Sequence, residues 1–365
     1  MITSILLLSL TLVFPATYFY AKRNPQFGSR PQKKDVLRYS RSPQWKDGQF
    51  LNSSVTTMDV NLWSMPGLLR EFIKGRRRRV PVSPLLVQRL NTKDFAEGSE
   101  PKFVWYGHSV VLFRVGGRNI LVDPMFGNDA SPIGPMRTRR FSENTLGLID
   151  SLPDLDLVLL THDHYDHLDY ESIVRIKEKT KAFWVALGTA RHLLRWGVPQ
   201  GMITEFDWWE EKELNELRII FTPSRHFSGR GLFDRAKSLW GGWVILSDEI
   251  RIYWSGDGGY DDHFKRIGQK YGPFDWGFIE CGQYNERWHQ IHLLPEEAIR
   301  AARDSRVSLA IPVHWAAFSL SLHPWDEPAE RFSESASRED QSASYPRLGR
   351  VVRQGMEPTE HWWRS

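Results

Sequence analysis

Residues Thr161–Asp169 read THDHYDHLD and directly follow the apolar run LDLVLL at 155–160. Such a run predicts a buried strand, and the loop that leaves it can aim His162 and His164 at one point. Asp166 and His167 can then reach a second, neighbouring point. Imidazole and carboxylate groups together suit Zn²⁺, and also Fe or Mn. Because the whole chain has only 12 histidines, three of them within this short motif indicate a metal site.

Three further candidates each close a predicted strand: His226 after LRIIFTPSR, Asp257 after IRIYWSG, and His314 after LAIPV. A single histidine at a strand end is more often structural than a metal ligand. Three such positions beside the His-x-His-x-Asp-His motif reverse that expectation. The sequence therefore predicts seven ligands for more than one metal ion.

Strands and helices alternate over most of the chain, which predicts an α/β fold. Residues 102–124 hold three short strands broken by Gly-His and Gly-Gly. Helical patterns follow at 169–180 and at 295–304, the second beginning at Pro295. Several strands end in His or Asp, so the polar residues are expected at one edge of a sheet.

These features resemble the metallo-β-lactamase superfamily. The resemblance implies an αββα sandwich with two zinc ions per chain at one edge. It implies that His162, His164 and His226 hold the first ion, that Asp166, His167 and His314 hold the second, and that Asp257 bridges them.

The flanking sequence is similar to that of a narrower family, the phospholipases D that hydrolyse N-acylphosphatidylethanolamine, together with their bacterial relatives. The similarity runs from about Asn24 to about Glu327. It rests on WYGHSVVLF, LVDPMF, DWWEE, FTPSRHFSGRGLFDRAKSLWGGW, SGDGGY, QYNERW, HLLPEEA and the His-Trp that follows IPV. It implies hydrolysis of a phosphodiester between the phosphate and the head group.

In this interpretation two divalent ions lower the pKa of a bridging water, and the resulting metal-bound hydroxide attacks the phosphodiester. Asp257 and Asp166 are the expected catalytic carboxylates, and the proton passes to Asp257 or to a water. His108 and His292 are expected to contact the substrate, with a structural turn as the alternative for His108. Asp163 is expected to point away from the metals and to hydrogen-bond a ligand histidine or the backbone.

The N-terminal run Ile2–Ala21 has no charged residue, and its length is near the ~20 residues that span a bilayer as a helix. We interpret 1–23 as a membrane anchor, with a cleaved signal peptide as the alternative, because no basic residue precedes the run. The side of the membrane is left open. Residues 24–100 are expected to form an extended arm on the body, 101–330 the catalytic domain, and 331–365 a partly irregular tail.

A net charge of +4 over 365 residues argues against a dedicated nucleic-acid binder, and the single Cys281 excludes an intrachain disulfide. The expected partners are a phospholipid substrate and a membrane, with a homodimer as a further option. The basic run Arg76–Arg79 follows an apolar segment and is either a solvated face or a membrane contact. The alternative function is a hydrolase of the same fold that acts on a soluble substrate such as a lactone.

Overall fold

The computed structural model describes residues 19–60, 63–75, 77–132, 137–231 and 233–364. Within these ranges no helix is both long and apolar enough to cross a membrane. The predicted hydrophobic segment, Ile2–Ala21, falls almost entirely outside the described residues.

The first sheet has seven strands in the order β15-β3-β4-β5-β6-β7-β8. Strands β5 to β8 run parallel to one another, while β3 pairs antiparallel with β4, and β4 with β5. The Gly-His and Gly-Gly breaks separate β3, β4 and β5 as predicted. The strands are β3 (Lys102–Trp105), β4 (Val111–Val115), β5 (Arg118–Val122), β6 (Leu157–Leu160), β7 (Phe183–Ala186), β8 (Ile203–Phe206) and β15 (Val351–Arg353).

The second sheet has six strands in the order β14-β13-β12-β11-β10-β9. Strands β12, β13 and β14 are parallel, and β9 to β12 are antiparallel neighbours. The strands are β9 (Glu211–Leu214), β10 (Leu217–Thr222), β11 (Gly242–Leu246), β12 (Arg251–Trp254), β13 (Phe274–Glu280) and β14 (Val307–Val313).

The two sheets pack face to face. Successive side chains of β6 therefore alternate between the core enclosed by the sheets and a second core on the outer face. Leu157 and Leu159 belong to the core between the sheets, whereas Val158 and Leu160 belong to a second core on the outer face. Between the sheets, the ring of Phe278 on β13 lies 5.0 Å from the ring of Phe103 on β3. All four residues of β6 are fully buried, as expected for a parallel strand covered on both faces.

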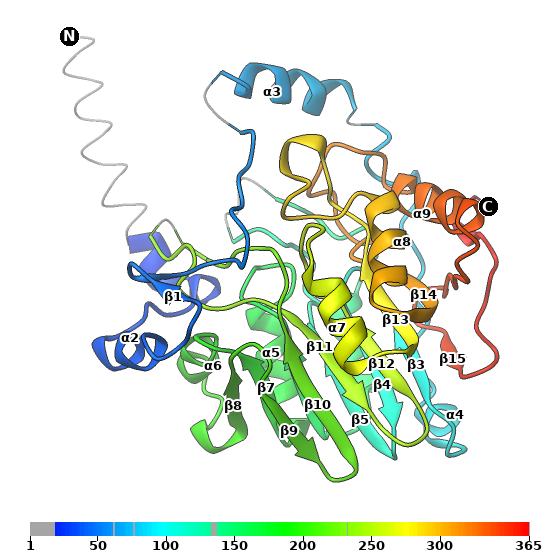
Figure 1. Ribbon diagram of the computed structural model, residues 1–365, viewed down its shortest axis with the longest axis horizontal. Helices are drawn as coiled ribbons and strands as arrows, with labels where there is room; N and C mark the ends of the chain where they lie inside the picture. Colours follow the sequence, from blue (N-terminus) through cyan, green and yellow to red (C-terminus); the bar gives the residue numbers. More distant parts are fainter. Residues whose placement is uncertain (1–18, 61–62, 76, 133–136, 232, 365) are drawn as a thin grey trace.

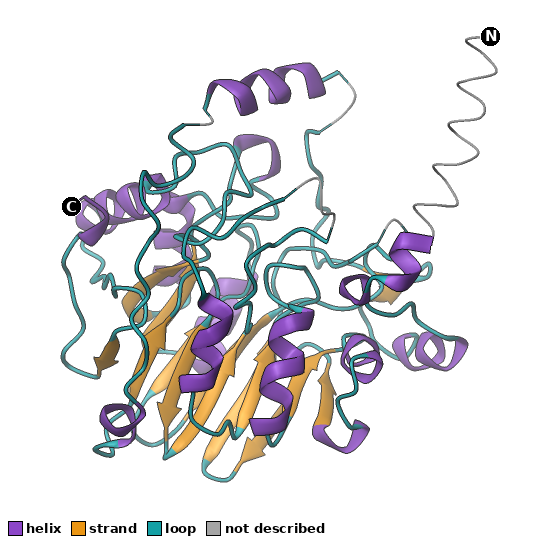
Figure 2. Ribbon diagram, turned by 180° about the vertical axis from the view of Figure 1, so that it is seen from behind, coloured by secondary structure: helices purple, strands orange, loops and turns teal. Residues whose placement is uncertain are grey.

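Helices cover the outer faces and complete the predicted αββα sandwich (Figures 1 and 2). On the first sheet these are α5 (Tyr170–Ile176) and α6 (Ala190–Arg195), which contribute to the outer core. On the second sheet they are α7 (His263–Tyr271), α8 (Pro295–Asp304) and α9 (Glu327–Arg338). Helix α8 begins at Pro295, where the sequence predicted it.

The arm and the tail are more structured than the sequence indicated. The arm, expected to be extended, contains α2 (Lys33–Tyr39), the small hairpin β1 (Trp45–Lys46) with β2 (Gln49–Phe50), α3 (Met65–Lys74) and α4 (Thr92–Ala96). The tail contributes part of α9 and the edge strand β15, which pairs antiparallel with β3. The predicted boundary at 331 therefore lies inside a helix, and the tail is part of the sandwich.

Candidate metal centre

The predicted ligands follow the carboxyl ends of strands that run in the same direction. His162 follows β6 by two residues, Asp257 follows β12 by three, and His314 directly follows β14. His226 lies four residues beyond β10. Each strand is largely buried and therefore largely apolar along its length, so the polar ligand residues lie in the loops that follow the strands. The structure brings all seven predicted ligands together at this edge.

The first set consists of His162, His164 and His226. The Nδ1 atom of His164 lies 2.9 Å from Nε2 of His162 and 3.2 Å from Nε2 of His226. Burial lowers the pKa of His162 and His226 well below the ordinary histidine value, and that of His164 to about 4. Three neutral imidazole nitrogens thus converge at spacings close to the roughly 3.3 Å between ligand atoms of a tetrahedral zinc site.

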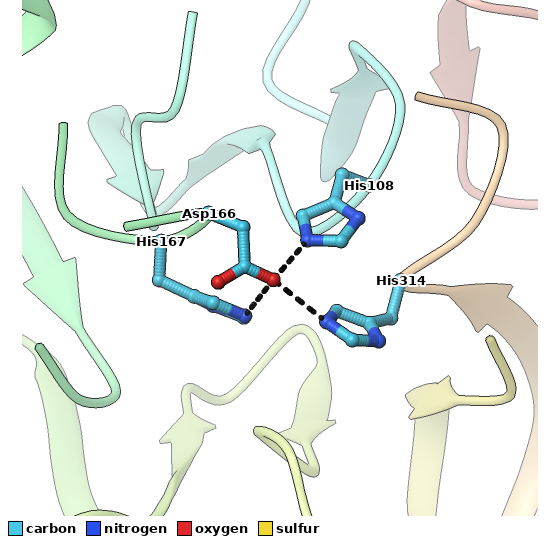
Figure 3. Close-up of side chains that lie close together, drawn as sticks. All are labelled: His108, Asp166, His167 and His314. Atoms are coloured by element: carbon cyan, nitrogen blue, oxygen red, sulfur yellow. Dashed lines mark hydrogen bonds and ion pairs between the residues drawn. The ribbon is translucent and has the colours of Figure 1, made fainter. Parts of the chain in front are cut away.

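The second set surrounds Oδ2 of Asp166 (Figure 3). This oxygen lies 3.7 Å from Nε2 of His167, 3.4 Å from Nε2 of His314 and 2.9 Å from Nε2 of His108. Nε2 of His167 and of His314 is buried and makes no hydrogen bond of good geometry with the described residues. Buried nitrogens without a well-formed hydrogen bond are costly, so this arrangement of nitrogens and carboxylate oxygens fits a cation between them.

Asp257 lies between the two sets. Its Oδ2 atom is 3.0 Å from Nε2 of both His167 and His314, and 3.9 Å from Nε2 of both His162 and His226. Burial alone would raise the pKa of Asp257, but the facing His167 and His314 hold it well below the ordinary range. A carboxylate in this position can contact two ions at once.

Asp123 supports the ligands from behind, and the sequence analysis did not single it out. Its carboxylate accepts hydrogen bonds from Nδ1 of His167 (2.9 Å), from the Thr161 backbone N–H (2.9 Å) and from the Thr161 hydroxyl (2.8 Å). The Thr161 oxygen in turn lies 3.0 Å from Nδ1 of His162. Burial raises the pKa of Asp123, and these donors act against that shift. Its position one residue after β5 is the sequence feature from which Asp123 could have been identified as a site residue.

Asp163 points away from the metal cluster, as predicted. Its Oδ1 atom accepts a hydrogen bond from the Gly229 backbone N–H (2.7 Å), and its Oδ2 lies 3.3 Å from Arg191 and 3.2 Å from His192. The hydroxyl of Ser238 also donates to Oδ2. Burial would raise the pKa of Asp163, but these partners hold it well below its usual range. The buried carboxylate therefore ties the loop after His226 to the metal-binding motif.

The two predicted substrate residues both lie at the cluster. The fully buried ring of His108 lies 4.1 Å from the ring of His314, and burial lowers its pKa to about 3. His292 stacks on His314 at 5.3 Å, and its Nδ1 lies 2.5 Å from Oε1 of Glu280. Glu280 also accepts a 2.6 Å hydrogen bond from the Gly258 backbone N–H. This carboxylate was not among the residues predicted from the sequence, although it ends β13.

The backbone at this edge is strained. His108, Asp123 and His314 all adopt left-handed conformations, with φ of 54°, 42° and 69°. Such conformations are uncommon for residues other than glycine and concentrate at functional sites. Gly282 allows the close approach that His314 needs, because a Cβ atom there would lie 2.0 Å from the His314 carbonyl oxygen. The fold thus stores strain where the polar side chains meet.

Comparison with known proteins gives a consistent set of relatives. Residues 118–315 match the family described as beta-lactamase superfamily domain. The chain is 36% identical over 331 residues to an uncharacterized protein of Mycobacterium tuberculosis, covering 88% of each chain. It is 32% identical to N-acyl-phosphatidylethanolamine-hydrolyzing phospholipase D 1 of Caenorhabditis elegans, covering 72% of this chain and 78% of that one. A metallo hydrolase from Ignicoccus hospitalis has the same fold, with a TM-score of 0.54 and 22% identity over 69% of this chain and 97% of that one.

Proposed function

Because this chain belongs to the metallo-β-lactamase superfamily and is a metal-dependent hydrolase of that family, we propose that it is a zinc-dependent phosphodiesterase of the phospholipase D type. Its proposed substrates are phospholipids that resemble N-acylphosphatidylethanolamine. The observation that carries the metal chemistry is the position of Asp257 Oδ2 between two sets of histidine nitrogens. The similarity to the C. elegans phospholipase D supports the substrate class.

The donor set fits two divalent ions. His162, His164 and His226 would hold one, and Asp166, His167 and His314 the other, with Asp257 shared. Nitrogen and carboxylate ligands favour zinc over the hard cations Mg²⁺ and Ca²⁺, which prefer oxygen ligands. Two such ions, when bound, supply Lewis acidity and positive charge to a phosphodiester.

The remaining contributions come from the chain itself. Asp257 and Asp166 are the proposed catalytic carboxylates, because Oδ2 of Asp257 faces both histidine sets and Oδ2 of Asp166 faces the second set. Glu280 holds Nδ1 of His292, so the ring is fixed with Nε2 available to contact a phosphate oxygen of the substrate. His108 orients Asp166 through their 2.9 Å contact.

The test is a product analysis of the purified full chain by mass spectrometry. N-acylphosphatidylethanolamine in mixed micelles should give phosphatidic acid and N-acylethanolamine, and an Asp257→Asn variant should lose most of this activity. Asp262→Asn is the matched control, because it removes a nearby carboxylate outside the cluster. Hydrolysis of a lactone without any phospholipid product would reject the substrate class and retain the hydrolase.

A further inference from the structure

Helix α3 (Met65–Lys74) carries an apolar stripe that the protein does not bury. Its sequence, MPGLLREFIK, places apolar residues at 65, 68, 69, 72 and 73. This spacing normally marks the face that a surface helix packs against a core. Here no residue of the helix is buried, and Leu69, Phe72 and Ile73 are 60%, 51% and 66% exposed. The stripe therefore faces solvent in the described structure.

The helix is nevertheless held in a defined place, outside the layers of the sandwich and beyond the loops at one edge of the sheets (Figures 1 and 2). The Glu71 carboxylate accepts two hydrogen bonds from Arg287, at 3.0 and 2.9 Å. The guanidinium of Arg79 donates to the Phe72 carbonyl at 2.6 Å and lies over the Phe72 ring. The Arg287 pair fixes the polar flank of α3, and Arg79 covers one side of the Phe72 ring, which stays 51% exposed with the rest of the apolar stripe.

Positive charge surrounds the stripe. Arg70, Lys74, Arg77 and Arg78 lie on the helix or directly after it, and all are exposed. Glu71 is the one acidic residue in the sequence from 63 to 79, and it is paired with Arg287. An exposed apolar stripe flanked by unbalanced cationic side chains is complementary to an anionic lipid surface, where both parts gain favourable contacts.

The segment at residues 52–59, which precedes α3 in the chain, contacts both the metal centre and the partner of α3. The Asn52 side chain donates to the His226 carbonyl at 2.8 Å and accepts from the His226 N–H at 3.0 Å. Farther along the same segment, the Asp59 N–H donates to the carbonyl of Arg287 at 2.8 Å, and Arg287 is the residue that pairs with Glu71. A partner surface that binds α3 would therefore lie next to the loops around the metal centre.

We propose that α3 is a docking helix that lies in the head-group region of an anionic phospholipid bilayer, with its apolar stripe inserted and its basic residues at the phosphates. This inference deepens the proposed function and rests on it, since docking would present the metal centre to lipids still in the bilayer. A second copy of the chain on the same stripe is the competing occupant.

The first experiment locates the helix by fluorescence. An environment-sensitive dye is attached to Leu69→Cys in the full chain, and in a matched control to Met356→Cys, which is 75% exposed on the C-terminal segment. The native Cys281 is fully buried and can remain. With vesicles of phosphatidylglycerol and phosphatidylcholine, we expect a blue shift and quenching by lipid-borne quenchers at position 69 alone.

The control separates docking from simple tethering, because any attachment through residues 1–23 brings both labels near the membrane but inserts neither. An unshifted label at position 69, or equal shifts at both positions, would overturn the proposal. So would a blue shift without vesicles accompanied by a dimer mass in sedimentation, which would assign the stripe to a second copy.

The second experiment separates docking from catalysis. The variant Leu69→Asp/Ile73→Asp should lower hydrolysis of vesicle phospholipid at least 10-fold and leave hydrolysis of bis-(p-nitrophenyl) phosphate and the melting temperature unchanged. Equal activity of variant and native chain on vesicles would overturn the docking role. If the native chain inserts the label at position 69 but hydrolyses no phospholipid, the docking helix stands and the proposed function fails.

Discussion

Replacing Asp123 with Asn should weaken the metal centre without touching a ligand. Asp123 accepts three hydrogen bonds, and the one from Nδ1 of His167 leaves Nε2 of that ring free for a metal ion. An Asn side chain has a single acceptor oxygen and presents N–H groups to the other donors. His167 would then favour the tautomer with the proton on Nε2, which blocks the metal-facing nitrogen.

Loss of such a supporting partner typically lowers metal affinity by about 10–100-fold. That range corresponds to about 1.4–2.7 kcal/mol, and we expect Asp123→Asn to fall in its upper half because Thr161, and through it His162, is also affected. Affinity is measured by competition with a chromophoric chelator, using metal-depleted full-length protein. Activity is not needed for the readout.

The matched control is Asp156→Asn. Asp156 directly precedes β6, the strand that leads to Thr161, and lies at the end away from the metal centre, where it accepts from the Asn119 N–H at 2.9 Å and from Lys181 at 2.8 Å. Its replacement should leave metal affinity unchanged. If Asp123→Asn binds both ions as tightly as the native chain, the supporting role of Asp123 is refuted.

Further substitutions test the other parts of the account. His292→Ala and His108→Ala should each lower turnover, by about 100-fold for His292 because its contact to a phosphate oxygen is lost, with metal content retained in elemental analysis; loss of an ion would make that residue a ligand. Gly282→Ala should displace His314, since the new Cβ would lie 2.0 Å from its carbonyl oxygen, and metal titration should show one weakened site. Phe278→Ala should destabilise the chain by about 3–5 kcal/mol in denaturant unfolding, because Phe278 is fully buried between the sheets; a change below 1 kcal/mol would contradict that packing.

The sequence predicted the α/β fold and the ligand cluster because both leave local signals, whereas the αββα sandwich was implied by the family resemblance. Apolar runs mark buried strands, and polar residues at their carboxyl ends must meet when the strands share a sheet. The motif at His162–His167 concentrates four predicted ligands in six residues, so it can be recognised as a metal-binding motif without the tertiary structure.

The sequence could not reveal Asp123 and Glu280 in the same way. Asp123 is a single acid after β5 and Glu280 a single acid that ends β13. Their partners, His167 and His292, lie 44 and 12 residues away in the sequence. The edge strand β15 was missed because its three residues gain their structure from pairing with β3. Helix α9 was missed in part because serine-rich composition hides an amphipathic pattern.

The proposed metal centre holds two metal ions that share Asp257. Elemental analysis of active, untreated, full-length protein tests it most directly, with protein concentration determined independently. We predict two zinc ions per chain, and fewer in the Asp257→Asn variant. One ion or none in fully active native protein, or two tightly held ions in Asp257→Asn with normal turnover, would contradict the account.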